Sequence, residues 1–337
     1  MEYRRMGRSG LKVSEMCLGT MTFGHGTDER TSKSMVDICI DAGVNFFDTA
    51  DSYGGGESEV LLGKALKERR RDAVVATKFF NPMGPGPNDS GMSRVRVMNA
   101  VEHSLRRLQM DHVDIYYIHH VDVQSPLDEM LRALDDLVHQ GKVRYIACSN
   151  YEAWRLLEAL WISKMDGLSG FACYQPLYNL VVRDIEEELV PLCRLKGLGV
   201  VTWGPLGGGF LSGKYKPGDR ALKGTRSEEQ WAFPQEHFAP NADETLKGLL
   251  DVAKELGRSP AQVALRWILE QPGITSVLVG ARTMEHLKDN LQASTFRLQG
   301  EALQRLTEVS RLPDRYPKAM EMTMKARRDG AVKMPSL

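Results

Sequence analysis

Short apolar segments alternate with longer amphipathic ones along most of this chain, and that alternation limits the possible folds more than any other feature. The short segments are rich in β-branched and aromatic residues, which is typical of strands, whereas the longer ones repeat their apolar residues with a helical period. The predicted strands cover residues 15–19, 45–48, 73–78, 113–119, 143–149, 170–175, 199–203 and 276–279. The predicted helices cover residues 31–42, 58–67, 93–108, 127–140, 152–161, 185–196 and 283–293, with a helical region over 243–270.

Eight alternations of strand and helix predict an α/β protein whose single domain, residues 1–337, is a closed (β/α)8 TIM barrel. An open doubly wound sheet has the same periodicity and is the alternative. Ser9-Gly10 separates two short runs near the start, so residues 1–14 are predicted to form a hairpin that could close the lower end of the barrel. The barrel then covers residues 15–298, and residues 299–337 add a C-terminal helix and a charged tail.

Composition excludes several classes of protein. Lys plus Arg and Asp plus Glu both number 44, so no global field attracts nucleic acid. The five cysteines are scattered and include no CxxC pair, which argues against a disulfide framework or a zinc site and fits a reducing compartment. The start of the chain lacks the apolar stretch of a signal peptide, and no apolar run is long enough to span a membrane. We therefore expect a cytoplasmic protein whose oligomeric state the sequence leaves open.

Polar or aromatic residues stand at the ends of the predicted strands, and in a barrel these ends share one mouth, where active sites lie. They are Asp48, Lys78, His119, Ser149, Asn150, Gln175 and Trp203. Tyr53 follows Asp48 by five residues in the stretch Phe-Asp-Thr-Ala-Asp-Ser-Tyr-Gly. Two insertions rich in Gly and Pro, at 79–91 and 204–242, also follow strand ends. The sequence thus predicts an active site at this mouth.

Lys78 ends an apolar strand, so its ammonium needs a nearby anion, and Asp48 on the adjacent predicted strand is the natural partner. Such a pair could also serve only to hold two strands together. A phenol titrates near about 10 and needs a downward shift of roughly two to three units to act as an acid near neutral pH. An ammonium about 4 Å away contributes roughly 4 kcal/mol at an effective dielectric of about 20, and one pKa unit is about 1.36 kcal/mol. Lys78 could therefore make Tyr53 acidic.

His119 and His120 invite a metal interpretation, but neighbours on a strand point to opposite faces and cannot bind one ion. No HExxH motif or other ligand spacing is present, so no metal site is predicted. A neutral His119 could instead donate a hydrogen bond to a carbonyl oxygen. His120 is interpreted as structural.

Two later segments could hold phosphate. The glycine-rich stretch after Trp203 exposes backbone amides, although such loops more often only turn corners. A strand, a glycine turn, Arg282 and a helix starting near Thr283 form a stronger signal, because a helix N-terminus beside an arginine binds phosphate. Aromatic residues in or beside the rim loops could line a substrate pocket or simply pack those loops; they are Phe23, Phe79, Phe80, Trp231 and Phe233.

Several stretches, in this order, resemble signatures of the aldo-keto reductase family, and the resemblance runs from Tyr3 to about Leu312. They are Gly-Thr-Met-Thr-Phe-Gly, Phe-Asp-Thr-Ala-Asp-Ser-Tyr-Gly, Ala-Thr-Lys78, Asp-Ile-Tyr-Tyr-Ile-His119, Cys-Ser-Asn150, Tyr-Gln-Pro-Leu-Tyr-Asn179, Gly-Pro-Leu-Gly and Gly-Ala-Arg-Thr. The resemblance implies a barrel enzyme that reduces an aldehyde or ketone with NADPH, NADH remaining possible. It implies that Tyr53 is the general acid, that Lys78 and Asp48 tune it, and that His119 orients the carbonyl.

The same resemblance implies contacts along the whole cofactor. Ser149, Asn150 and Gln175 would hold the carboxamide, and Trp203 would stack on the nicotinamide. The remaining implied contacts are Gly19, Thr20, Met21 and Asp48 near the catalytic group, Gly204, Leu206, Gly208 and Lys214 at the pyrophosphate, and Gly280, Arg282, Thr283, His286 and Asn290 around the adenosine 2′-phosphate. His286 departs from the family pattern, which usually has glutamine there.

Two other functions compete with carbonyl reduction. Potassium-channel β subunits resemble this family and share several of its stretches, so a cofactor-sensing regulatory subunit is one alternative. His119 weighs against it, because the resemblance implies no histidine at that position in those subunits. The second alternative is a Schiff-base aldolase that uses Lys78.

Overall fold

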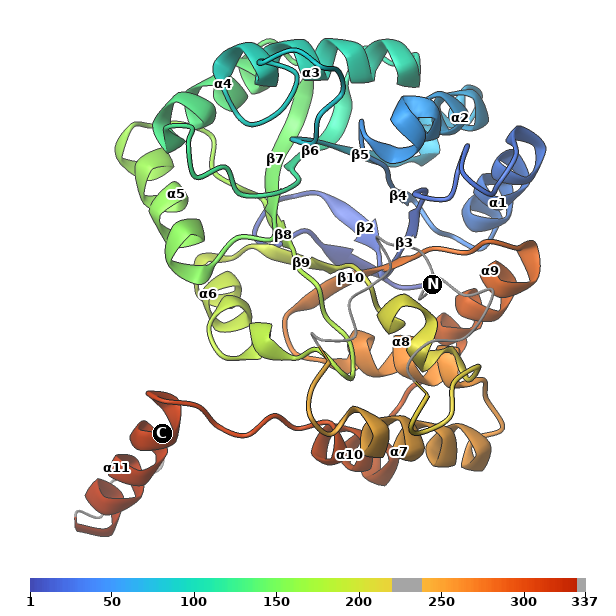
Figure 1. Cartoon of the computed structure of the whole chain (residues 1–337), viewed down its shortest axis with the longest axis vertical. Coiled ribbons are helices and arrows are strands. Elements are labelled where there is room, and N and C mark those ends of the chain that lie inside the picture. Colours follow the sequence, from blue (N-terminus) through green and yellow to red (C-terminus); the bar gives the residue numbers. More distant parts are fainter. Residues whose placement is uncertain (220–237, 332–337) are drawn as a thin grey trace.

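The computed structural model describes residues 1–219 and 238–331 (Figure 1). Eight parallel strands close into a barrel in the order β10-β3-β4-β5-β6-β7-β8-β9, which confirms the predicted barrel over the open sheet. The strands are β3 (Met16–Gly19), β4 (Phe46–Asp48), β5 (Val74–Phe79), β6 (Val113–Ile118), β7 (Val143–Ser149), β8 (Cys173–Gln175), β9 (Gly199–Thr202) and β10 (Ile274–Val279).

Helices surround the strands, and α11 extends away from the barrel as an arm (Figure 1). They are α1 (Glu29–Asp41), α2 (Glu57–Leu66), α3 (Arg94–Leu108), α4 (Leu127–His139), α5 (Ala153–Met165), α6 (Leu189–Lys196), α7 (Ala242–Glu255), α8 (Pro260–Glu270), α9 (Met284–Leu291), α10 (Gly300–Val309) and α11 (Lys318–Ala331). The predicted helical region over 243–270 is in fact two helices. Ser259 caps α8 by accepting a hydrogen bond from the Gln262 amide, and Pro260 cannot continue a helix from α7 because it lacks an N–H.

Alternation along the strands decides which side chains reach the barrel interior. In β5, Val74 and Ala76 belong to the apolar cluster inside the barrel, whereas Val75 and Phe79 pack in the layer between strands and helices. Because strand side chains alternate with a period of two, Lys78 continues the inward row. In β4, Phe46 likewise faces inward, and Asp48 follows it two residues later.

An antiparallel hairpin of β1 (Tyr3–Arg5) and β2 (Lys12–Ser14) precedes the barrel, as predicted. Met6 lies in its turn and is fully buried in the interior cluster, to which Phe46 of β4 also belongs. Gly7 has a φ of +57°, and a Cβ there would lie 2.2 Å from the Gly197 carbonyl oxygen, so the turn fits against the chain just before β9 only with glycine. The hairpin therefore covers the end of the barrel opposite the strand C-termini.

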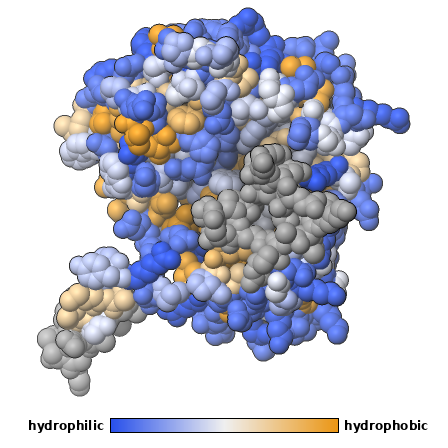
Figure 2. Space-filling model, viewed as in Figure 1, coloured by the Kyte–Doolittle hydropathy of each residue, from blue (hydrophilic) through white to orange (hydrophobic). Residues whose placement is uncertain are grey.

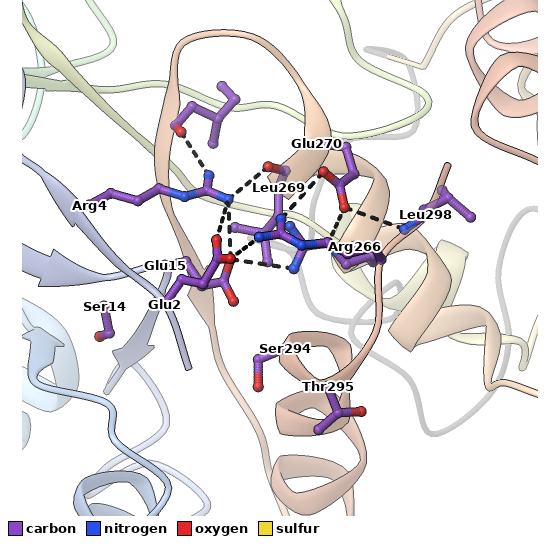
Figure 3. Close-up of polar contacts among 12 residues, drawn as sticks. Glu2, Arg4, Ser14, Glu15, Arg266, Leu269, Glu270, Ser294, Thr295 and Leu298 are labelled. Atoms are coloured by element: carbon purple, nitrogen blue, oxygen red, sulfur yellow. Dashed lines mark hydrogen bonds and ion pairs between the residues drawn. The ribbon is translucent and has the colours of Figure 1, made fainter. Parts of the chain in front are cut away.

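A charged network fastens the hairpin to the barrel (Figure 3). Glu15, 0% exposed, accepts hydrogen bonds from Arg4 at 3.1 Å and from Arg266 of α8 at 3.3 Å. Arg4 also donates to the Leu269 carbonyl oxygen at 3.0 Å, and Arg266 Nε lies 2.9 Å from a Glu270 oxygen. Elements far apart in sequence are thus joined through one buried carboxylate.

Hydrophilic residues cover most of the face seen in Figure 2, with apolar residues in small groups. No helix in the described part of the chain is long and apolar enough to cross a membrane. All five cysteines are buried and unpaired, and burial raises the pKa of Cys39 to about 12.

Candidate active site

A buried ion pair stands at the C-terminal ends of β4 and β5. Lys78 Nζ donates a hydrogen bond to Asp48 Oδ1 and another, 2.8 Å long, to the Thr49 carbonyl oxygen. Gln175, at the end of β8, donates from Nε2 to Asp48 Oδ2 at 2.9 Å across the barrel. Both oxygens of Asp48 therefore accept hydrogen bonds, which is the pattern of an ionised carboxylate.

The charge of Lys78 is maintained against burial. Burial disfavours the ammonium, but the Asp48 carboxylate and Tyr53 outweigh that effect and raise the pKa of Lys78 above its ordinary value. Burial also raises the pKa of Asp48, and Lys78 opposes that rise. Because two donors hold Asp48, we describe the pair as ionised, with the positive charge on Lys78.

Tyr53 begins a short 3-10 helix, Tyr53–Gly56, in the loop after β4. Lys78 Nζ lies 3.4 Å from the Tyr53 hydroxyl oxygen and 5.0 Å from the centroid of its ring. The loop is tied to β5 because the Asp51 amide donates to the Lys78 carbonyl oxygen at 3.0 Å. The predicted proximity of ammonium and phenol is therefore present in the fold.

His119 follows the last residue of β6 and lies beside Tyr53. Its amide donates to the Phe79 carbonyl oxygen at 3.0 Å, and its ring meets the Tyr53 ring edge-on, with centroids 5.8 Å apart and planes at 76°. Part of the residue stays exposed at the mouth, but most of its surroundings are protein. Burial, Lys78 and His120 lower the pKa of His119 well below its usual value, so the ring is neutral at physiological pH.

The predicted separation of His119 and His120 is wrong. Their rings stack with centroids 4.7 Å apart and planes at 10°. Strand β6 ends at Ile118, so both residues lie past the region where side chains alternate between faces. His120 also meets the Phe80 ring at 5.5 Å and stands at the mouth, where sequence reasoning had not placed it. Among the described residues no group of three potential metal ligands lies together, and the absence of a metal stays a prediction.

The four residues predicted at the nicotinamide end are brought together by the ends of β7, β8 and β9. Ser149 donates to the Gln175 carbonyl oxygen at 2.6 Å, and Asn150 donates from Nδ2 to the His119 carbonyl oxygen at 3.0 Å. Trp203 donates from Nε1 to Asn150 Oδ1 at 3.1 Å. Asn150 has a φ of +59°, a left-handed conformation that asparagine tolerates better than most residues.

Gly19, Thr20 and Met21 lie on the other side of Asp48. Gly19 ends β3 and pairs with Asp48 in the sheet, and the Thr20 amide donates to the Asp48 carbonyl oxygen at 2.9 Å. Thr20 is buried, whereas Gly19 and Met21 are partly exposed. These residues therefore border the ion pair.

The two predicted phosphate segments follow the neighbouring strands β9 and β10. After β9, Gly208 and Gly209 have φ values of +67° and +105°, so the chain turns tightly, and the Gly209 amide donates to the Leu206 carbonyl oxygen at 3.0 Å within the turn. Asn179 donates to the Gly204 carbonyl oxygen at 2.9 Å and fixes the start of this loop. Leu206, near the start of this loop, is partly exposed, and Lys214, at its end, is exposed.

After β10, Gly280 leads to the N-terminus of α9. Thr283 caps this helix by accepting a hydrogen bond from the His286 amide at 3.2 Å. Arg282 and His286 are exposed beside the cap, and Asn290 is buried two turns later. The bonds from Trp203 to Asn150 and from Asn150 to the His119 carbonyl oxygen connect the start of the first segment to His119.

The aromatic residues near the rim have different roles. Phe23 and Phe79 are buried in the apolar layer outside the strands, where Phe79 stacks on Tyr116 with centroids 4.8 Å apart. Those two pack the fold and do not line the mouth, whereas Phe80 is half-buried beside His120. Trp231 and Phe233 lie outside the described residues.

Three polar residues near the site were missed by sequence reasoning. Asp51 accepts a hydrogen bond from Arg96 of α3 at 2.6 Å, and Arg96 also donates to the Asn81 carbonyl oxygen at 3.1 Å. Asp51 could have been noticed, because it lies two residues before Tyr53. Arg96 gave no signal, because an arginine in a helix is ordinarily solvent-exposed.

Comparison with known proteins gives the same match over nearly the whole chain. Residues 15–311 match the model of the Aldo/keto reductase family. The chain is 40% identical over 323 residues to the uncharacterized oxidoreductase YrpG of Bacillus subtilis, covering 92% of this chain and 96% of that protein. It is 38% identical over 304 residues to a probable voltage-gated potassium channel subunit beta of Oryza sativa subsp. japonica, covering 87% and 91%. A putative channel subunit beta of Schizosaccharomyces pombe is 33% identical over 320 residues, covering 91% and 92%.

Proposed function

The chain belongs to the aldo/keto reductase family, as its motifs predicted, and we propose on that basis that it reduces an aldehyde or ketone to an alcohol with NADPH. One observation carries the proposal. The Lys78 ammonium lies 3.4 Å from the Tyr53 hydroxyl, and the neutral ring of His119 stands beside that same phenol. A proton donor, the charge that makes it acidic, and a second hydrogen-bond donor therefore face one small volume.

The residues present fit a nicotinamide dinucleotide. The amide groups of Asn150 and Gln175 can bind a carboxamide, and the Trp203 ring offers a face for stacking. The glycine-rich turn around Gly208 lets a pyrophosphate approach the backbone closely, and Arg282 at the capped start of α9 suits a further phosphate. When bound, the cofactor supplies the hydride that adds to the carbonyl carbon.

The protein's own groups handle the oxygen and the proton. Tyr53 gives its proton to the carbonyl oxygen as negative charge develops there, and Lys78 stabilises the phenolate that remains. Asp48 keeps Lys78 charged. His119 donates a hydrogen bond to the same oxygen, because its neutral ring retains one N–H. Positioned proton transfer contributes about 10²–10⁴ in rate, and one oxyanion donor contributes about 10²–10³.

Replacing Tyr53 with phenylalanine tests the acid directly. Tyr53→Phe removes only the hydroxyl, so we expect kcat to fall by about 10²–10⁴ while NADPH still binds. Quenching of NADPH fluorescence measures the binding, and consumption of NADPH with a panel of aldehydes, ketones and quinones measures the turnover. A variant that keeps most of its reductase rate would show that another group supplies the proton.

The channel subunits among the relatives support a second candidate, a regulatory subunit that binds NADPH without efficient turnover. The complete set of Asp48, Tyr53, Lys78 and His119 favours the reductase, and multiple turnovers by the wild-type protein would decide between the two. The aldolase alternative is disfavoured, because a Schiff base needs an unprotonated Lys78, and both the raised pKa and the bond to Asp48 oppose that state. A cytoplasmic location, small-molecule substrates and the absence of nucleic acid and membrane partners stay predictions.

A further inference from the structure

We propose that Asn81 sets the tautomer of His119: its side-chain amide donates to Nδ1, so that Nε2 carries the ring proton. Asn81 is a positioning residue in this proposal, and its importance for catalysis rests on the proposed carbonyl reduction. A neutral imidazole has one donor and one acceptor nitrogen. Which nitrogen donates decides whether His119 can hydrogen-bond a developing oxyanion or would repel it.

The contact is direct. Asn81 Nδ2 lies 3.5 Å from His119 Nδ1 and 3.0 Å from the Ser52 hydroxyl oxygen. An amide nitrogen has two hydrogens and no lone pair to offer, so it can donate to both and accept from neither. With the amide nitrogen turned toward the ring, His119 Nδ1 acts as the acceptor, which leaves the proton on Nε2.

The backbone around Asn81 is held in an unusual conformation. Phe80, between Lys78 on β5 and Asn81, has a φ of +153°, which is rare for a residue with a side chain. Such strain costs about 1–3 kcal/mol and persists only where surrounding contacts impose it. Here the Gly91 amide donates to the Phe80 carbonyl oxygen at 2.8 Å, and Arg96 donates to the Asn81 carbonyl oxygen at 3.1 Å.

Arg96 connects the two halves of the site. It is 4% exposed, and the same nitrogen that donates to the Asn81 carbonyl also donates to Asp51 at 2.6 Å, two residues before Tyr53. Asn81 in turn contacts Ser52, the residue between Asp51 and Tyr53. One buried arginine thus holds the segment before Tyr53 and the Asn81 backbone next to each other.

Among the described residues, the Asn81 side-chain amide contacts Nδ1 of His119, and several charged or titratable groups stand nearby. Lys78 and His120 both lower the pKa of His119, and Tyr53 meets the ring edge-on. Asp48 is occupied by Lys78 and Gln175, and Asp51 by Arg96. An aspartate in place of Asn81 would reverse the polarity of the contact with little change of shape.

Asn81→Asp is therefore the decisive variant, with nitrogen-15 NMR of the histidine rings as the readout. In the wild-type protein without substrate we expect His119 to be neutral with its proton on Nε2. In Asn81→Asp the carboxylate accepts from Nδ1, so the neutral ring should become the Nδ1–H tautomer, whose Nε2 can no longer donate a hydrogen bond. A wild-type ring protonated on Nδ1, or an unchanged ring in Asn81→Asp, would overturn the proposal.

Kinetics provide a second, independent readout. We expect kcat/KM at neutral pH to fall about 10²-fold in Asn81→Asp, comparable to the loss of an oxyanion donor, and a new titration to enter the pH profile. Asn81→Ala, which removes the donor without reversing polarity, should lose less. Asn99→Asp adds the same charge at an exposed position of α3 and should change neither the ring nor the rate. Equal losses in Asn81→Asp and Asn81→Ala with one unchanged pH profile would contradict the tautomer role.

The two proposals can fail separately. If the wild-type protein turned over no carbonyl compound, the proposed function would fall, while the NMR spectra would still decide the role of Asn81. If wild-type turnover were normal and the His119 spectra were identical in wild type and Asn81→Asp, only the role of Asn81 would be refuted.

Discussion

At the scale of single residues, the site depends on two buried titratable groups, one of which the fold keeps charged and the other neutral. Lys78 stays charged because Asp48 is bonded to it, and His119 stays neutral because burial and Lys78 disfavour its protonation. Each state follows from a neighbour contributed by another strand. The chemistry of any one of these residues therefore cannot be assigned from its own side chain.

Asp51 should make the stability of the folded protein depend on pH. Burial raises its pKa from 3.8 to about 6, and Arg96 only partly opposes the rise. A carboxyl group with a higher pKa in the folded state binds its proton more tightly there, so this group's contribution to the free energy of unfolding falls as pH rises from about 4 to about 6. The fall is at most about 3 kcal/mol, since one pKa unit is about 1.36 kcal/mol.

Asp51→Asn should remove that dependence. Chemical denaturation of both proteins between pH 4 and pH 7 measures it, and the stability of the wild type relative to the variant should decrease across the window. Asp51→Asn also loses the ion pair with Arg96, which shifts the variant's free energy of unfolding by an amount that is nearly constant above the folded-state pKa. Parallel stability curves for the two proteins would contradict the raised pKa.

At the scale of elements, helix α9 is where the choice between NADPH and NADH would be made. Thr283 satisfies the His286 amide, and Arg282 is exposed just before the helix. A phosphate here would meet both the positive end of the helix and a guanidinium. His286 stands where the family usually has glutamine, but this difference does not remove the Arg282 guanidinium.

Arg282→Ala should therefore weaken NADPH selectively. We expect KM for NADPH to rise about tenfold or more, consistent with the loss of a charge-assisted hydrogen bond of about 1.5–3 kcal/mol, while KM for NADH changes little. Lys288→Ala, which removes another exposed positive charge from α9, is the matched control. A proportional rise for both cofactors would mean that Arg282 does not distinguish them.

At the scale of the whole molecule, the network around Glu15 joins the N-terminal hairpin to α8 (Figure 3). It lies at the end of the barrel opposite the candidate active site. Removing one member of a buried ion network leaves its partners without compensation, which costs about 3–5 kcal/mol. Exposed pairs contribute only about 0–1 kcal/mol. Burial therefore decides which charges in this network matter.

Glu15→Gln should lower the free energy of unfolding by about 3–5 kcal/mol, because Arg4 and Arg266 lose their shared anion. Glu2→Gln is the control, since Glu2 belongs to the same network through Arg4 and Arg297 but its side chain is 48% exposed. Denaturant titration measures both, and kcat of the folded protein should stay at the wild-type value in each. Equal destabilisation by the two substitutions would contradict the role assigned to burial.

The sequence by itself determined the eightfold alternation, the hairpin and the placement of Asp48, Lys78 and His119 at strand ends. Those features are local: a period of two selects the strand face, and strand ends collect at one mouth whatever the loops do. The family motifs added the residues predicted to bind the cofactor, in chain order. The break between α7 and α8 was also encoded locally, by Ser259 and Pro260, and was overlooked.

Only the tertiary structure decided what those residues touch. The stacking of His119 on His120, the bond from Gln175 to Asp48 across the barrel, and the hold of Arg96 on Asp51 and Asn81 join residues between 1 and 127 positions apart. No periodicity encodes such contacts, because they arise where irregular chain beyond the strand ends folds back against a distant helix or strand. Burial and partner geometry, which set the protonation states, exist only once that packing has formed.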